Sequence, residues 1–276
     1  MIAIKCDKLF LRPLDSDFHE LALIRIGSAN DGGYVVPSKI LYDCEAILSF
    51  GYGFNFDFEK SLLDSYGIRE AYLFDGSINL RYALRQWVGN LINQLLGRPS
   101  AYITSWRNLK NFISMSKTNG LIYFNEYVGI NGDNSNFLAI LKNFLEFKSK
   151  HFILKCDIEG GEYGIIDDII LNYAYFDLMI IEFHGIASDE KKFEVSLLKI
   201  LNFFHIVNIN INNNSVTLSK LEVDVDVLEI TFINKSIIGI EEVPQYATST
   251  HNKLNSKNNL QNTEYYYYFS DNIPTI

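Results

Sequence analysis

The chain of 276 residues is 48% hydrophobic and 21% charged, a composition typical of a globular protein with a sizeable core. Its net charge of −9 argues against general nucleic-acid binding, and its three cysteines, which lack CxxC spacing, indicate neither a disulfide framework nor a thiolate metal site. Because the first residues do not resemble a secretory signal and no apolar stretch reaches membrane-spanning length, we expect a cytoplasmic protein without a membrane span.

Short apolar runs alternate with segments of helical period along the chain, which is the pattern of a parallel sheet wrapped by helices. The predicted strands are residues 46–50, 70–74, 121–127, 151–156, 178–183, 205–210 and 227–234. The predicted helices are residues 56–66, 80–96, 106–116, 136–148, 161–173 and 189–204. Between the last two strands we expect only a turn or a short ribbon, so that pair should be antiparallel. The prediction is therefore an α/β fold with one doubly wound, seven-stranded sheet that is mostly parallel and has an antiparallel last strand.

The first strand runs into a glycine pair within ILSFGYGFNFDFE, residues 47–59. Gly51 and Gly53 follow the carboxyl end of that strand, where ligands bind in open α/β sheets. Glycine removes the side chain at a point where a cofactor must approach the backbone. A simple tight turn accounts for the glycine pair equally well.

The second strand ends in an acid, Asp75 of AYLFDGS. An acid at this point of a βαβ unit is placed to accept both hydroxyls of an adenosine ribose, although it could instead cap the following helix. Phe56 stands where the third glycine of G-x-G-x-x-G would be. A nucleoside cofactor without a pyrophosphate is therefore favoured over a dinucleotide.

The segment between Asp75 and Glu126 contains no acidic residue and six basic ones, Arg81, Arg85, Arg98, Arg107, Lys110 and Lys117. This pattern predicts a basic helical insertion at about residues 79–118 and a bound anion. Arg81 and Arg85 lie one helical turn apart and are suited to bind a phosphate of the substrate. A solvated helix face is the alternative.

Acidic residues follow the fourth strand in FILKCDIEGGEYGII, residues 152–166. Asp157, Glu159 and Glu162 lie around a glycine pair, so their mutual repulsion should raise the pKa of one carboxyl group or favour a bound cation. Glu162 taken alone is interpreted as an acid at a solvated helix N-terminus.

The fifth strand ends in LMIIEFHG, where Glu182 and His184 point to the same side. A histidine there, with a pKa near neutrality, could remove a proton from a hydroxyl group. The other histidines are not part of a carboxylate constellation and are interpreted as structural; they are His19, His151, His205 and His251.

The last part of the chain, residues 248–276, is predicted to be a polar loop followed by a tyrosine-rich tail. Residues 248–264 are of low complexity and are expected to form a mobile loop. The run YYYYF, residues 265–269, needs burial as an edge strand or at a subunit contact. The whole chain, residues 1–276, is predicted to be a single domain, and a homo-oligomer is compatible with it.

The segments RIGSANDGGYVVP, ILSFGYGFNFDFE, LFDGS, LKCDIEGGEYGII and MIIEFHG resemble the FkbM-type branch of class I S-adenosylmethionine-dependent methyltransferases. The resemblance covers residues 24 to about 185 and implies a Rossmann-like sheet. It also implies roles for a set of residues: the methionine part of the cofactor at Gly51 and Gly53, the ribose at Asp75, the cofactor carboxylate at Arg25, the wall of the site at Asp31 and Gly33, and the rim between cofactor and acceptor at Asp157 with Glu159 beside it.

The function expected from these observations is S-adenosylmethionine-dependent O-methylation, with His184 as the base and Asp157 as the second candidate. A divalent cation at Asp157 would help by lowering the pKa of the acceptor hydroxyl. The expected acceptor is a small molecule, a nucleotide-activated or phosphorylated sugar used in capsular polysaccharide synthesis, and no nucleic acid. The alternatives are a nicotinamide-dependent oxidoreductase and a non-catalytic binding module with a cofactor fold.

Overall fold

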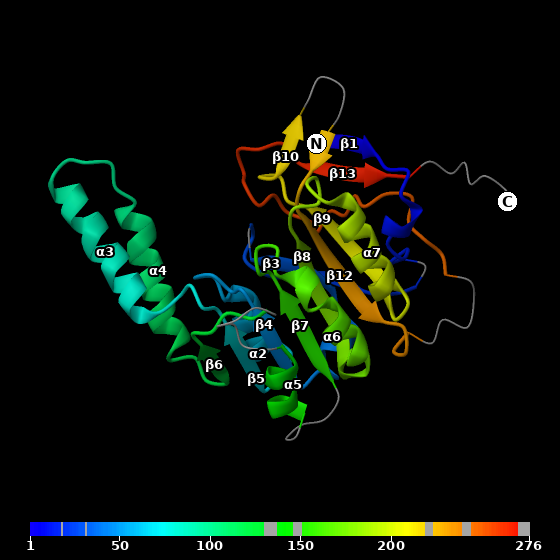
Figure 1. Cartoon of the computed structure of the whole chain (residues 1–276), viewed down its shortest axis with the longest axis horizontal. Helices are drawn as coiled ribbons and strands as arrows, with labels where there is room; N and C mark the ends of the chain where they lie inside the picture. Colours follow the sequence, from blue (N-terminus) through cyan, green and yellow to red (C-terminus); the bar gives the residue numbers. More distant parts are fainter. Residues whose placement is uncertain are drawn as a thin grey trace.

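The computed structural model describes residues 1–17, 19–30, 32–129, 137–145, 151–218, 223–238 and 244–269. A seven-stranded sheet forms its centre, with the order β6-β5-β4-β7-β8-β12-β9 (Figure 1). Its strands are β4 (Ala46–Phe50), β5 (Glu70–Phe74), β6 (Leu121–Phe124), β7 (Phe152–Cys156), β8 (Phe176–Phe183), β9 (Phe204–Ile211) and β12 (Leu228–Asn234). All seven predicted strands are present.

The direction of the strands confirms the predicted sheet. Strands β4 to β8 pair in parallel, whereas β12 is antiparallel to both β8 and β9. Strand β12, the last strand of this sheet in chain order, lies between β8 and β9, and this leaves β9 at the edge. The fold is therefore α/β and doubly wound, with an antiparallel last strand.

Helices cover both faces of the sheet, and this explains why its central strands are apolar throughout. Every residue of β4, β7, β8 and β12 is buried, as expected for strands packed on both faces. One core cluster contains side chains of α5 (Phe137–Leu145), α6 (Ile166–Leu171) and α7 (Glu190–Leu201). The other cluster contains side chains of α1 (Ser38–Leu41), α2 (Asp57–Ser65) and α4 (Tyr102–Met115).

The structure departs from the prediction in the helix expected at residues 161–173. That stretch is divided into η2 (Glu162–Gly164), α6 and η3 (Tyr173–Tyr175), so it forms three short pieces rather than one helix. The predicted helix at 136–148 corresponds to α5, and residues 136 and 146–148 of that prediction lie outside the described residues. A further single turn, η1 (Leu9–Leu11), lies near the N-terminus.

Three small two-stranded sheets surround the main sheet. Strands β2 (Leu23–Gly27) and β3 (Gly33–Pro37) form an antiparallel hairpin that the sequence analysis did not predict. The expected short ribbon before the last strand is present as β10 (Val216–Leu218) and β11 (Val223–Val225). The third sheet joins β1 (Ile2–Lys5) to β13 (Tyr265–Tyr268) in parallel, so the tyrosine run pairs as a strand within its own chain.

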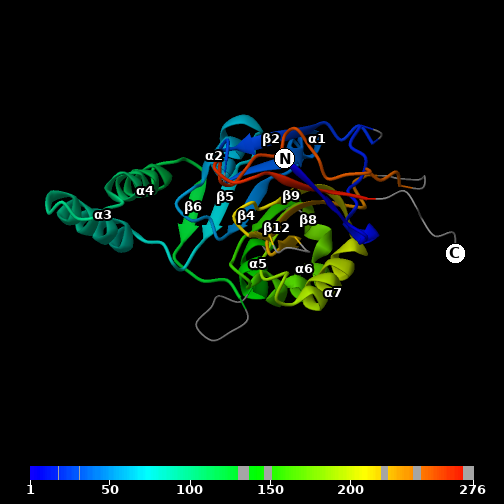
Figure 2. The ribbon, with the colours of Figure 1, turned by 90° about the horizontal axis from the view of Figure 1, so that it is seen from above.

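Helices α3 (Leu80–Leu95) and α4 form a hairpin that projects from the body of the protein, as both views show (Figures 1 and 2). We call residues 79–118 the arm. Asn79 begins it by accepting a hydrogen bond from the backbone nitrogen of Tyr82. Phe54 connects it to the body, because its ring stacks on that of Tyr82 and its carbonyl accepts from the side chain of Asn111. The predicted insertion is thus two helices packed on each other.

The polar segment at residues 248–264 contains no helix or strand, but its asparagines are bonded to β9 and to the turn after it. Asn208 donates to Asn255 (2.9 Å) and accepts from Asn252 (3.2 Å). Asn213 donates to the carbonyl of Asn259 at 2.8 Å. These side-chain hydrogen bonds connect the loop to the body of the protein, whereas its polar composition had suggested a mobile segment. None of the helices in the described part of the chain has the length and apolar character needed to cross a membrane.

Candidate functional site

A cavity of about 720 Å³ opens at the carboxyl ends of β4, β5 and β7. Its size is within the range of small-molecule sites. Five residues predicted from the sequence line it, namely Gly51, Gly53, Asp75, Asp157 and Glu159. The cavity therefore lies at the edge of the sheet where the glycine and acidic motifs were expected to meet.

The two glycines of the first loop serve different purposes. Both have a positive φ, +72° at Gly51 and +58° at Gly53, a conformation that favours glycine. A Cβ at Gly51 would lie 1.6 Å from the carbonyl oxygen of Asp157, so this glycine lets two strand ends pack together. A Cβ at Gly53 would have no atom within 4 Å. Gly53 thus borders open space at the cavity wall.

Asp75 connects the loops that follow β4 and β5. Its Oδ2 accepts from the backbone nitrogen of Gly53 (3.1 Å), and its Oδ1 accepts from the nitrogen and hydroxyl of Ser77 (2.9 and 2.6 Å). The alternative that Asp75 caps the following helix is wrong, because the side chain of Asn79 caps α3. Asp75 is held at the cavity wall with its carboxylate beside the glycine loop.

The segment before β4 contributes to the cavity through two residues that were not predicted. Gly32 and Tyr34 line the cavity, whereas Gly33 and Arg25 are not among its lining residues. The Arg25 guanidinium donates to the carbonyls of Ser28 (3.3 Å), Asn30 (2.7 Å) and Leu254 (3.4 Å), so in this structure it holds loops together. A Cβ at Gly33 would lie 2.0 Å from the Ser28 carbonyl. Asp31 lies outside the described residues.

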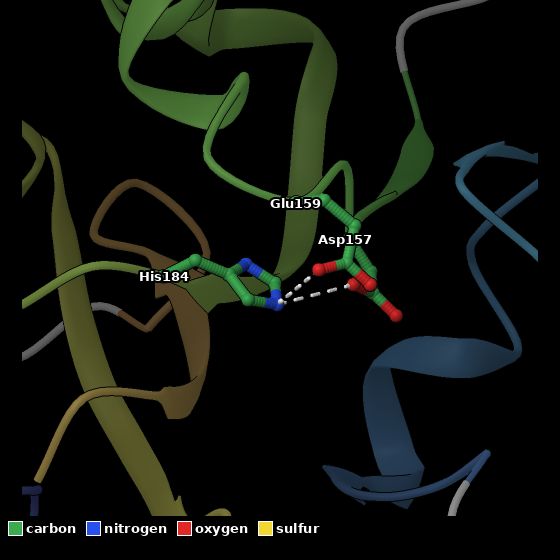
Figure 3. Close-up of side chains that lie close together, drawn as sticks. All are labelled: Asp157, Glu159 and His184. Atoms are coloured by element: carbon green, nitrogen blue, oxygen red, sulfur yellow. Dashed lines mark ion pairs between the residues drawn. The ribbon is translucent and has the colours of Figure 1, made fainter. Parts of the chain in front are cut away.

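His184, Asp157 and Glu159 come together at the rim of the cavity, although they follow two different strands (Figure 3). His184 Nε2 lies 3.8 Å from Asp157 Oδ1 and 3.7 Å from Glu159 Oε2. One ligand atom from each of the three residues lies within 4.8 Å of the others, a spacing compatible with three ligands of a divalent cation.

Glu162 is the residue that the sequence analysis misjudged. The expectation of a solvated acid at a helix N-terminus is wrong, since Glu162 is 1% exposed. Its Oε1 accepts from the backbone nitrogen of His184 at 2.6 Å and lies 3.3 Å from the ring Nδ1, while Oε2 accepts from Gly160 at 2.8 Å. A carboxylate behind Nδ1 orients the ring so that Nε2 faces the cavity rim, as in many catalytic and metal-binding histidines.

The acids around His184 change its titration. Burial alone lowers the pKa of His184, but the hydrogen bond and charge of Glu162, together with the charges of Glu182 and Asp157, outweigh it and raise the pKa to about 9. Glu182 is buried and lies 4.0 Å from His184 Nε2, on the same side of the strand end as expected. The acids around the ring therefore favour the imidazolium form of His184.

Lys155 is a site residue that the sequence analysis missed. It is 4% exposed at the cavity wall, and its Nζ donates to the carbonyl of Gly51 at 2.8 Å. Burial opposes the charged form, but Glu59, Asp157 and Glu182 outweigh it and raise the pKa of Lys155. The feature of the sequence that could have indicated Lys155 is that it is the single charged residue within the apolar strand FILKC.

Arg81 and Arg85 lie on the exposed side of the arm and are not among the residues that line the cavity. Arg81 stands four residues beyond Ser77, which does line it. The two arginines are one helical turn apart, as expected from their spacing.

Comparisons with solved structures find distant likenesses. The 23S rRNA methyltransferase ErmE is 12% identical over 71% of this chain and 66% of that chain, with a TM-score of 0.38. A fibrillarin/Nop5p complex is 12% identical over 69% of this chain and 72% of that chain, with a TM-score of 0.36. The Streptococcus pneumoniae protein Sp1610, a putative tRNA (m1A22) methyltransferase in complex with S-adenosyl-L-methionine, is 10% identical over 71% of each chain, with a TM-score of 0.33. At these values the likenesses assign no activity.

No protein-family model matches the chain, and no curated protein matches it. Membership of the FkbM-type family therefore stays a prediction that rests on the motifs, and the function has to be inferred from the residues of the cavity.

Proposed function

We propose that the protein is an S-adenosylmethionine-dependent O-methyltransferase. The observation that carries this proposal is the charge of the cavity wall around Asp75. The described wall carries the carboxylates of Asp75, Glu126, Asp157 and Glu159 and the ammonium groups of Lys155 and Lys192. An excess of negative charge attracts a cationic sulfonium and repels a dinucleotide pyrophosphate.

The cofactor fits the cavity in one orientation. The Asp75 carboxylate would accept hydrogen bonds from the ribose hydroxyls, and Gly53 leaves the space beside it empty. Phe74, Tyr127 and Val128 add apolar surface next to Asp75, which suits the flat adenine base. The methionine end would then extend toward Gly51 and Asp157, at the end of the cavity nearest His184.

Bound S-adenosylmethionine supplies a methyl group that an acceptor oxygen attacks in line with the departing thioether. The residues of the protein align the acceptor and take up its proton. His184 is the proposed base, and Glu162 holds its ring in position through Nδ1. Because its pKa is raised to about 9, His184 has to lose its own proton before it can accept one, so methyl transfer should speed up as the pH rises toward that value. Asp157 is the second candidate for the base. In the alternative with a divalent cation, Asp157, Glu159 and His184 would hold it, His184 Nε2 would then be a ligand and not the base, and the cation would lower the pKa of the acceptor hydroxyl.

The proposed acceptor is a hydroxyl of a phosphorylated or nucleotide-activated sugar that serves surface polysaccharide synthesis. The excess of acidic groups in the wall disfavours a phosphate inside the cavity, so we place the phosphate outside it. An acceptor that extends past Ser77 reaches the first turn of α3, where Arg81 and then Arg85 can bind a phosphate bidentately.

Titration calorimetry tests the cofactor. S-adenosylmethionine and its demethylated product should bind the wild-type protein, and Asp75→Ala should weaken both at least about tenfold. Asp64→Ala is the matched control, because Asp64 is an acid on the exposed side of α2, paired with Lys60, and should change nothing. Binding of NAD in place of both compounds would support an oxidoreductase, and binding of none of the three would support a non-catalytic module.

Incubation with candidate sugars tests the acceptor. Release of the demethylated product should depend on a phosphorylated or nucleotide-activated sugar, and Arg81→Ala with Arg85→Ala should raise KM for that sugar about tenfold while kcat changes little. Transfer to unphosphorylated sugars with an unchanged KM in the double variant would overturn the acceptor proposal and leave the cofactor proposal intact.

A further inference from the structure

The arm exposes an apolar stripe that the cavity does not use. On α3, Leu84, Val88, Ile92 and Leu95 follow one another at intervals of four and three residues, so they share one side of the helix. Their exposed fractions are 41%, 44%, 50% and 78%. A contiguous exposed apolar stripe of this kind marks an interaction surface.

The second helix of the arm, α4, also exposes apolar side chains. Ile103 is 80% exposed and Trp106 is 38% exposed, and the Nζ of Lys110 lies 5.1 Å from the Trp106 ring centroid. The ring of Trp87 lies 5.3 Å from that of Trp106, so the two tryptophans join the helices. Each helix thus mixes exposed apolar side chains with basic ones.

The charge of the arm limits what its partner can be. The arm has six Lys and Arg residues and no Asp or Glu, whereas the remainder of the chain has 18 basic and 33 acidic residues. Two arms with like charge repel each other, which disfavours pairing between the arms of two copies. A nucleic acid would be attracted by the charge but would leave the apolar stripe in water.

We propose that the arm binds the surface of an anionic lipid bilayer. Amphipathic helices that carry Lys or Arg together with Trp and Leu bind in the plane of the membrane interface, with their apolar side chains among the lipids. Anionic headgroups attract the basic residues. The projection of the arm keeps the acidic body away from the same surface (Figure 2). This inference does not depend on methyl transfer.

Intrinsic fluorescence provides a direct test, because the only two tryptophans of the chain, Trp87 and Trp106, lie in the arm. The purified full chain is mixed with vesicles of phosphatidylcholine alone or with about one third phosphatidylglycerol. Anionic vesicles should shift the emission to the blue and sediment the protein at least about tenfold more strongly than neutral ones. High salt should weaken the binding.

Two arm variants separate the contributions. Leu84→Ser with Ile92→Ser and Leu95→Ser should weaken vesicle binding about tenfold or more. Arg98→Gln with Lys110→Gln should remove most of the preference for anionic lipid. The matched control replaces three exposed apolar residues of α6 and α7 with serine, at Leu171, Val195 and Leu198, and should bind as the wild type does. Circular dichroism and thermal unfolding confirm that each variant is folded.

Several outcomes would overturn the proposal. These are failure to sediment with anionic vesicles, equal binding by wild type and both arm variants, and equal loss in the control variant. A stable dimer that the serine arm variant converts to monomer, without vesicle binding, would identify a second copy as the partner. Binding of a short single-stranded RNA instead of vesicles would identify a nucleic acid.

Discussion

Glu162 holds His184 at two points, its main-chain nitrogen at 2.6 Å and its ring Nδ1 at 3.3 Å. Because Glu162 is 1% exposed, water screens its charge weakly and the imidazolium is stabilised. The pair joins the loop after β7 to the end of β8. The position of the proposed base and its protonation are therefore set by the same buried carboxylate.

Replacing Glu162 with glutamine should lower the pKa of His184 from about 9 toward the ordinary value of 6.5. The amide keeps the shape and the acceptor oxygen, but the negative charge that favours imidazolium is gone. Nuclear magnetic resonance titration of the chelator-treated protein measures the shift. In Glu159→Gln the pKa should move little, since Glu159 is 88% exposed. An unchanged pKa in Glu162→Gln would contradict this account.

The same shift couples His184 to stability. A folded pKa of about 9 lies above the unfolded value of 6.5, so the folded protein binds more protons between them. The stabilisation is complete below pH 6.5 and is lost as the pH rises through 9. The free energy of unfolding, measured with urea, should fall as the pH rises between these values, and it should fall less in Glu162→Gln. A decline of the same size in both proteins would exclude His184 as its source.

Replacing Lys155 with methionine should destabilise the protein by about 3 kcal/mol. The variant loses the hydrogen bond to the Gly51 carbonyl and leaves the buried charge of Glu59 without its compensating cation. Urea denaturation measures the loss. Lys39→Met, at an exposed position, should cost less than about 0.5 kcal/mol, and similar losses in the two variants would contradict the role of burial.

Alanine at the two glycines of the first loop should separate folding from ligand binding. Gly51→Ala places a methyl group 1.6 Å from the Asp157 carbonyl and should cost about 3 kcal/mol of stability. Gly53→Ala meets no atom within 4 Å and should cost about 1 kcal/mol, from its left-handed backbone alone. Calorimetry should nevertheless show weaker binding of S-adenosylmethionine to Gly53→Ala. Tight binding by this variant would show that the cofactor does not approach Gly53.

His205 should make the protein sensitive to acid. Burial, with the charges of Lys235 and His19, lowers its pKa from 6.5 to about 4. The unfolded chain therefore binds more protons between these values, and stability falls as the pH drops through that range. In the wild type, the free energy of unfolding measured with urea should fall from pH 6.5 to 4. It should fall less in His205→Gln, whereas His251→Gln should behave as the wild type does. Equal slopes in wild type and His205→Gln would remove His205 as the cause.

The predicted sheet matches the structure closely because its strands are short apolar runs bounded by glycine and acidic residues. The ends of β4 and β5 are the predicted ones. Parallel strands that are buried on both faces need continuous apolar sequence, which is visible without tertiary information. The antiparallel last strand also followed from the absence of a helix before it.

The site was only partly predictable, because burial depends on contacts between distant segments. Asp157 and His184 could be placed at one edge from their strand ends alone. The sequence around Glu162 resembles a helix N-terminus, and nothing local shows that the carboxylate turns inward to His184. Lys155 of β7 contradicts the expectation that charges are exposed, and its partner Glu59 lies in α2, far away in the sequence. Local patterns do not reveal such pairs.

The pairing of β1 with β13 has a consequence for how the protein is made. Ile2 lies opposite Tyr265, so roughly 260 residues are synthesised between the two strands. During translation β1 has no partner strand until all seven strands of the central sheet have been synthesised. Closure of this pair is therefore expected to be a late event, after the cavity-forming strands have come together. A truncation or tag that disturbs Ile2–Lys5 should release the tyrosine strand and leave the sheet intact.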